Sequence, residues 1–382
     1  MAKIIKAGVD GGNNSLKLWA DGAEPLLIPA IYSMYVGETT EVFDQVDLIT
    51  EQLVDNIDIT IVTSKAIEVT NARYIIGNKV LSDRLTPVEM ESKSNKSTDI
   101  TPVLLTLAGL TIDAIKRSPD KAKIAVSYDI ANALPVNTIT TAAAKIHAER
   151  FIGAHVVKFH QESGREIEVT ITIEFCKCLP EGAAASWGVV FDEKGKYIKR
   201  EVELDGDLKN ISFENRKMFH SDIGAGTTEL VTTQGVQYLP KLSKGLGYGT
   251  KDTINNIQTR WNRENVRFPI ESVAEFNDIY YNTEHHLNNK LRIFSKDFLN
   301  QLAERLAVDI INQINYVKDN VFIFIYGGGS IILKEALTEV LRKKGFLDNL
   351  IFLNDPIFVN ARGLLVFAHS PIYEAQKNQV GV

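Results

Sequence analysis

The sequence is poor in cysteine and contains no long hydrophobic run. Its two cysteines, Cys176 and Cys178, lie one residue apart. Such neighbours on one strand form a disulfide poorly, and no second cysteine pair exists to complete a zinc site, so we expect packed free thiols in a reducing compartment. No stretch reaches the roughly 18 apolar residues of a membrane span. The first residues also lack the apolar segment of a signal peptide, so we expect a soluble, cytoplasmic protein.

The sequence also lacks an excess of positive charge. Its formal net charge is −6, which provides no broad cationic surface for nucleic acid or an anionic membrane. Any contact with DNA is therefore expected to be local or made through a partner. With 382 residues and 45% hydrophobic content, the chain is long enough for two domains, each with its own core.

One short pattern occurs twice, in D-G-G-N-N-S-L-K-L at residues 10–18 and in D-I-G-A-G-T-T-E-L at residues 222–230. In each copy an Asp is followed by Gly at the second place, a hydroxyl residue at the fifth and Leu at the eighth. Strand-like segments flank each copy, so the sequence predicts two β-hairpins. The later half of the chain thus repeats the plan of the first, which indicates two similar domains.

Both predicted turns have the composition of a phosphate-binding loop. Glycine lets the main chain approach closely, so that successive N–H groups converge on a phosphate, while hydroxyl groups and Lys17 add donors. The carboxylates of Asp10 and Asp222 would face the same site, and a hydrated Mg²⁺ is expected between them. Either hairpin alone would be a weak signal, since tight turns use Asp and Gly for conformational reasons. The expected nucleotide ligands in the two turns are Gly11, Gly12, Asn13, Asn14, Ser15, Lys17, Gly224, Ala225, Gly226, Thr227 and Thr228.

A third glycine-rich segment, I-Y-G-G-G-S at residues 325–330, follows a strand that the sequence predicts to be buried and precedes a predicted helix. One glycine would suffice for this turn, so three predict a bare backbone against which adenine or ribose can lie. The Walker pattern G-x-x-x-x-G-K-[ST] is absent, and a nucleotide site here needs a different fold. The expected nucleoside contacts are Gly327, Gly328, Gly329 and Ser330.

In their order and separation these segments resemble the two phosphate motifs and the adenosine motif of the actin, sugar-kinase and heat-shock-chaperone superfamily. The segments F-I-G-A-H-V-V-K and D-P-I-F-V-N-A-R-G-L-L-V-F-A are similar to the layout of the bacterial ParM/StbA group of actin-like proteins. The resemblance implies an α/β protein with the actin-like (ribonuclease H-like) fold, in which two similar domains each have a mixed sheet flanked by helices and the nucleotide occupies the interdomain cleft. The implied domains are residues 1–216, with a small inserted subdomain at about 31–99, and residues 217–360, with a helical insertion at about 255–315; a C-terminal helix, 361–382, returns to the first domain.

The resemblance also implies an activity. It is ATP hydrolysis coupled to dynamic filaments of this chain, which move plasmid DNA through an adaptor protein bound to a centromere-like site. The cofactor would be Mg²⁺ with ATP or ADP, held through water by Asp10 and Asp222, and the sequence does not distinguish ATP from GTP. Asp222 and Glu181 would be catalytic, because Glu181 in L-P-E-G-A-A-A matches the residue that positions the attacking water. Glutamate is also common at a helix start, and the excursion at residues 191–216 separates Glu181 from Asp222 by more of the chain than the family pattern suggests.

Three other functions remain open at this point. A small-molecule kinase on the same fold would need an aspartate base, for which Asp129 is the candidate. A cytoskeletal actin homologue unrelated to segregation and an ATP-binding scaffold without hydrolysis are the others. The polar run S-K-S-N-K-S-T-D at residues 92–99 is interpreted as a mobile or solvated loop, and phosphate binding by its lysines is the alternative.

Overall fold

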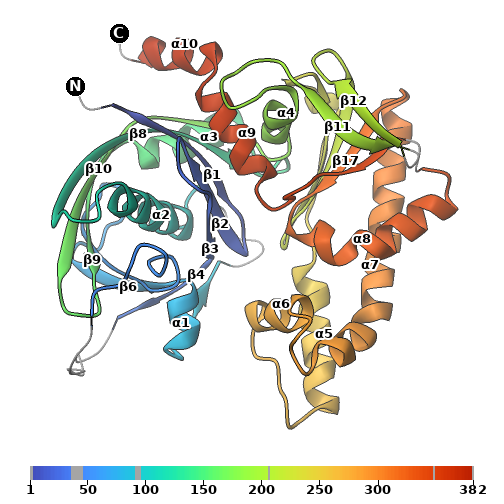
Figure 1. Cartoon of the computed structure of the whole chain (residues 1–382). Coiled ribbons are helices and arrows are strands. Elements are labelled where there is room, and N and C mark those ends of the chain that lie inside the picture. Colours follow the sequence, from blue (N-terminus) through green and yellow to red (C-terminus); the bar gives the residue numbers. More distant parts are fainter. Residues whose placement is uncertain (1–2, 36–45, 91–95, 205–206, 347–348, 381–382) are drawn as a thin grey trace. The chain divides into compact units, whose positions relative to one another are not determined.

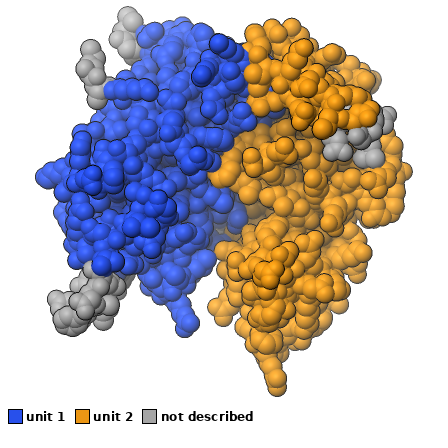
Figure 2. Space-filling model, viewed as in Figure 1, with its two compact units in different colours: residues 1–196, 360–382 blue, residues 197–359 orange. Residues whose placement is uncertain are grey.

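The computed structural model describes residues 3–35, 46–90, 96–204, 207–346 and 349–380. The chain divides into two compact units, residues 1–196 with 360–382 and residues 197–359, coloured blue and orange in Figure 2. Residues 197–216, which we expected in the first domain, belong to the second unit. The C-terminal segment belongs to the first.

The first unit is built on a ten-stranded mixed sheet with the order β3-β2-β1-β8-β10-β9-β5-β6-β4-β7. The pairs β1–β8 and β8–β10 are parallel, and the other neighbouring pairs are antiparallel. The expected subdomain at residues 31–99 contributes β4 to β7 to this same sheet. The strands are β1 (Ile5–Gly11), β2 (Ser15–Ala20), β3 (Leu26–Pro29), β4 (Ile31–Met34), β5 (Ile57–Thr63), β6 (Ala72–Ile76), β7 (Val88–Glu89), β8 (Lys123–Leu134), β9 (Gly153–His160) and β10 (Glu166–Pro180).

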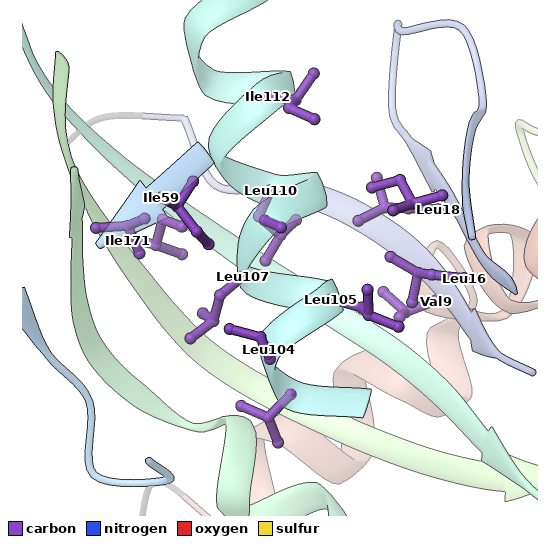
Figure 3. Close-up of a cluster of buried hydrophobic side chains, with 14 of the residues drawn as sticks. Val9, Leu16, Leu18, Ile59, Leu104, Leu105, Leu107, Leu110, Ile112 and Ile171 are labelled. Carbon is purple, nitrogen blue, oxygen red and sulfur yellow. The ribbon is translucent and has the colours of Figure 1, made fainter. Parts of the chain in front are cut away.

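Helix α2 (Thr101–Arg117) forms the core of this unit, and the strands curve around it (Figure 1). Residues 101–115 are all buried, which is the pattern of a helix with no solvent-facing side. Its leucines pack against Val9 and Leu16 from the first hairpin and against Ile59 and Ile171 from β5 and β10 (Figure 3). The first hairpin therefore packs against this hydrophobic core.

The C-terminal segment of the first unit consists of two helices, α9 (Val359–Ala368) and α10 (Pro371–Val380), where we expected one. Helix α9 packs directly against the main chain of β1 and of α4. A Cβ on Gly8 of β1 would collide with the carbonyl oxygen of Ala361, and one on Gly363 would collide with that of Ala184. Glycine at both positions therefore lets α9 join β1 closely to α4. The remaining helices of this unit are α1 (Asn78–Ser82), α3 (Thr141–Phe151) and α4 (Ala183–Val190).

The second unit has a six-stranded mixed sheet with the path β15-β14-β13-β17-β18, and β16 pairs with β14. Its strands are β13 (Lys217–Ile223), β14 (Thr228–Gln234), β15 (Gln237–Tyr238), β16 (Lys244–Leu246), β17 (Phe322–Tyr326) and β18 (Leu350–Phe352). The expected helical insertion corresponds to α5 (Lys251–Glu264), α6 (Val273–Tyr281) and α7 (Asn288–Val317), with a short helix η1 (Pro240–Leu242) before them and α8 (Gly328–Lys343) after them. The excursion at 191–216 contains an antiparallel hairpin, β11 (Lys199–Leu204) and β12 (Asp207–Ser212).

Two further expectations can be compared with the structure. Cys176 and Cys178 are buried free thiols, as predicted, and burial raises the pKa of Cys178 to about 12. None of the helices within the described ranges is long and apolar enough to cross a membrane.

Candidate functional site

The repeated sequence pattern forms the same structure in both units. In the first, β1 pairs antiparallel with β2, so that Asp10 lies opposite Lys17, and β1 also runs parallel to β8. In the second, β13 pairs antiparallel with β14, so that Asp222 lies opposite Glu229, and β13 runs parallel to β17. The two predicted hairpins are therefore confirmed, and each occupies the equivalent place in its sheet.

The two turns are closed by the same hydrogen bond. The amide of Gly12 donates to the carbonyl of Ser15, and the amide of Gly224 donates to the carbonyl of Thr227, both at 3.0 Å. A Cβ on Gly12 or on Gly224 would lie 3.0 Å from that same carbonyl oxygen. A side chain at the second position after the aspartate would thus be crowded in both turns. This explains the spacing that the sequence repeats.

The first turn carries a positive charge. The amine of Lys17 lies 3.5 Å from a carboxylate oxygen of Asp10, and both side chains are largely buried. A Cβ on Gly12 would come within 2.8 Å of that amine, so the lysine side chain lies across the turn. A lysine amine at such a turn suits a phosphate.

Glu181 lies where β10 ends and α4 begins. Its backbone N–H donates to the carbonyl of Leu134 at 2.8 Å, and Gly182 follows with φ of 78°. The side chain is buried, and its carboxylate accepts a hydrogen bond from the amine of Lys96 at 2.7 Å. Burial raises the pKa of Glu181, with a smaller contribution from the charge of Asp10, while Lys96 opposes the shift. Glu181 and Asp10 are therefore close enough to interact through their charges.

The interpretation of residues 92–99 as a mobile or solvated loop is wrong for Lys96 and Ser97, while Thr98 is exposed. Lys96 and Ser97 are both buried. Arg150 of α3 donates to the carbonyls of Ser97 and Asp99 at 2.9 and 2.7 Å, which ties this segment to the fold. Residues 92–95 lie outside the described residues. No local pattern could have identified Lys96, because its partner Glu181 is 85 positions away in sequence.

In the second unit, the start of α5 contacts the second turn. The amides of Thr250 and Lys251 donate to the carbonyls of Gly224 and Ala225 at 3.2 and 2.9 Å. A Cβ on Gly249 would collide with both carbonyl oxygens, so glycine is required for this approach. The hydroxyl of Thr228 donates to the carbonyl of Tyr248 at 3.0 Å. The carbonyls of Gly224 and Ala225 therefore accept hydrogen bonds from within the second unit.

The three consecutive glycines do not share one role. Gly327 has φ of 87°, and a Cβ there would lie 2.5 Å from a carboxylate oxygen of Asp222. A Cβ on Gly329 would lie 2.7 Å from side-chain carbons of Ile223 and Thr250. Gly328, the first residue of α8, has nothing within 4 Å of such an atom. Close packing against Asp222, Ile223 and Thr250 therefore requires glycine at positions 327 and 329, whereas Gly328 is open in the direction of a side chain. That the three glycines contact the nucleoside stays a prediction.

Other predicted site residues are placed as follows. Ser330 is buried, and its hydroxyl donates to the carbonyl of Gly327 at 2.8 Å within the first turn of α8. Asn13 and Asn14 lie in the first turn, with the carbonyl of Asn14 accepting from the amide of Ala30, and Gly226 lies in the second. Asp129, the candidate kinase base, is buried, and both of its carboxylate oxygens accept from Lys377 at 2.8 and 2.7 Å. Its carboxylate therefore serves to anchor α10.

The donor set can be compared with what a magnesium ion requires. Within the described parts of the chain there is no group of three or more His, Cys, Asp or Glu side chains that could hold a metal ion. Asp10 and Asp222 each bring one buried carboxylate to the end of a hairpin strand. A single buried carboxylate of this kind suits an ion that keeps most of its waters and takes other ligands from phosphate, which is the usual coordination of Mg²⁺.

Comparisons with known proteins agree on the fold. The family of the archaeal actin homologue MreB-like C-terminal domain matches residues 221–339, which is less than half of the chain. The crystal structure of actin-like protein Alp7A has a TM-score of 0.73 and 19% identity, covering 99% of this chain and 100% of that chain. The structure of Bacillus thuringiensis ParM with ATP has a TM-score of 0.63 and 16% identity, covering 98% and 99%. No curated protein matches the sequence.

The fold and the paired hairpins define the chain as a protein with the actin-like fold, as the sequence predicted. Within that class, the resemblance to ParM-type actin-like proteins is confirmed at the level of the fold.

Proposed function

We propose that this chain is a magnesium-dependent ATPase that binds one nucleotide with both hairpins. The observation that carries the proposal is the equivalence of the two turns, each with an aspartate near a strand end, a closely packed glycine two places later and the same closing hydrogen bond. Bacillus thuringiensis ParM, which has the same fold, has been solved with ATP, with ADP and with AMPPNP. A nucleotide is therefore the ligand class that best fits this pair of turns.

In this proposal the first turn and Lys17 bind the β- and γ-phosphates, and the second turn binds them from the other side. Asp10 and Asp222 would hold Mg²⁺ through water, and the ion would supply positive charge to neutralise the phosphates. Gly328 and the uncapped start of α8 offer open backbone to the nucleoside. The preference between ATP and GTP would be decided by contacts of the base at this place.

Glu181 is proposed to orient and deprotonate the water that attacks the γ-phosphate. Its buried carboxylate has a raised pKa, which makes it a better proton acceptor than an exposed glutamate. Replacing a positioned general base typically lowers the rate about 10²- to 10⁴-fold. Glu181→Gln keeps the shape of the side chain and removes this function.

We further propose that ATP drives assembly of the chain into filaments and that hydrolysis destabilises them. The γ-phosphate would make contacts that ADP cannot make, and these contacts can favour one arrangement of the protein over another. Relatives with this fold include actin homologues and ParM. A net charge of −6 favours movement of plasmid DNA through a DNA-bound adaptor over direct DNA binding. The kinase alternative is less well supported, because its candidate base Asp129 accepts hydrogen bonds from Lys377 at both carboxylate oxygens.

Light scattering with parallel phosphate release tests the proposal on the full chain. We expect scattering to rise with Mg²⁺-ATP, to fall as phosphate appears, and to stay low with Mg²⁺-ADP or after chelation of Mg²⁺. Glu181→Gln should assemble with ATP and persist, while the exposed control Glu162→Gln should behave like the unmodified chain. Phosphate release by Glu181→Gln at the unmodified rate would refute the role of Glu181. Absence of ATP binding would refute the whole proposal.

A further inference from the structure

The first unit contains a buried ion pair that the sequence did not predict. The amine of Lys96 lies 2.7 Å from the carboxylate of Glu181, and each side chain is only 8% exposed. Removing two charges from water is unfavourable, and the attraction between them offsets this only when the geometry is good. A hydrophobic pair could fill the same space without that penalty. The pair therefore calls for a reason beyond stability.

The backbone around Lys96 is held from two sides. Arg150 binds the carbonyls of Ser97 and Asp99, and the amide of Thr101 donates to the carboxylate of Asp99 at 2.8 Å at the start of α2. Both α2 and α3 thus fix the segment from which Lys96 extends. A lysine with an anchored backbone can hold its partner carboxylate in one orientation.

A small cavity of about 10 Å³ lies beside Lys96, lined by Gly11 from the first turn and by Thr106, Asn132 and His147. This is about the room that one water molecule needs. Both side-chain atoms of Asn132 and the Nδ1 of His147 are buried without a hydrogen-bond partner among the described residues. Burial, with smaller contributions from Arg150 and Lys96, lowers the pKa of His147 to about 3, so its ring is neutral. One water here would satisfy these polar atoms beside the lysine.

We propose that Lys96 is a positioning residue that holds Glu181 toward the attacking water, and that a buried water at Asn132 and His147 supports Lys96 from behind. This inference rests on the proposed ATPase function. Lys96 itself need not touch the nucleotide. Without the ammonium group of Lys96, the buried Glu181 carboxylate would lose this charged hydrogen-bond partner and would no longer be held in one orientation.

The test is steady-state ATP hydrolysis and ATP binding by Lys96→Met, Lys96→Arg, Glu181→Gln and the double variant Lys96→Met/Glu181→Gln. Misplacing a catalytic group by about 1 Å can lower a rate about 100-fold, so we expect kcat of Lys96→Met to fall roughly 10- to 100-fold with ATP affinity unchanged. Lys96→Arg keeps a charged donor and should recover much of the rate. The exposed Lys145→Met serves as the matched control on the same unit. Urea unfolding of each variant confirms that it is folded.

The double variant separates positioning from a merely structural effect. If Lys96 acts through Glu181, the double variant hydrolyses ATP no more slowly than Glu181→Gln alone, because the second change has nothing left to misplace. Additive losses, an equal loss of ATP affinity, or an unchanged kcat in Lys96→Met would each overturn the inference while the ATPase proposal stands. Absence of hydrolysis by the unmodified chain would overturn the proposed function and this inference with it.

Discussion

Gly327 and Gly328 are neighbours for which the structure predicts opposite consequences of the same substitution. Gly327 has φ of 87° and ψ of 162°, a backbone region that is essentially restricted to glycine. A Cβ there would also lie 2.5 Å from a carboxylate oxygen of Asp222 and from the carbonyl oxygen of Ile223. At Gly328 the same atom would meet nothing within 4 Å. Alanine should therefore damage the fold at the first position and leave it intact at the second.

The magnitude follows from two contributions. Holding alanine in the backbone conformation of Gly327 costs about 1–3 kcal/mol. Forcing a methyl group into a filled space typically costs another 1–3 kcal/mol or so. We expect Gly327→Ala to lower the free energy of unfolding by roughly 2–6 kcal/mol, out of a total of about 5–15 kcal/mol for a typical protein. Gly328→Ala should change it by less than about 1 kcal/mol, in the stabilising direction, since alanine is the better helix former.

Urea unfolding followed by circular dichroism measures the difference, with hydrogen exchange of β13 and α8 to assign it to the second unit. With a denaturant slope of about 3 kcal/mol per molar, the midpoint for Gly327→Ala should fall by about 1–2 M. An unchanged midpoint would refute the packing argument. ATP affinity measured on the folded Gly328→Ala variant then tests the nucleoside site. We expect weaker binding, because the methyl group occupies the open backbone, and undiminished affinity would place the nucleoside elsewhere.

Two further predictions concern buried charge. Lys377→Met leaves the buried Asp129 carboxylate without this cation, so urea unfolding should show a loss of about 3–5 kcal/mol in the stability of the first unit. Lys116→Met, at an exposed lysine, should cause almost no loss. Equal losses in the two variants would contradict the prediction. Burial lowers the pKa of His220 to about 3, below its unfolded value of about 6.5. The unfolded chain therefore binds a proton that the folded chain does not, and stability is greatest above pH 6.5 and falls toward pH 3. His220→Phe should remove about 2 kcal/mol of the loss between pH 7 and pH 5, with the similar contribution of His147 remaining. An unchanged pH dependence would show that His220 is protonated in the folded state.

Several features were predictable because their cause is local in sequence. The hairpins follow from Asp, Gly and hydroxyl spacing within nine residues, and the strands that form each hairpin are neighbours in the chain. Helix α2, Thr101–Arg117, also has a local cause, because an apolar run with basic residues at its end is typical of a buried helix. The number of C-terminal helices was missed. The hairpin within 191–216 was also missed, although E-V-E-L-D-G at residues 201–206 alternates charged and apolar residues before an Asp-Gly pair, which is a hairpin signal.

The sequence by itself determined the two hairpin turns, since the close packing at Gly12 and Gly224 and the hydrogen bond that closes each turn involve only atoms a few residues away. Only the tertiary structure decided which side chains meet across the chain. It paired Glu181 with Lys96 across 85 positions and Asp129 with Lys377 across 248 positions, and it set Gly327 against Asp222. Partners in such contacts are chosen by the packing of whole strands and helices, so the local pattern around each residue carries no trace of them.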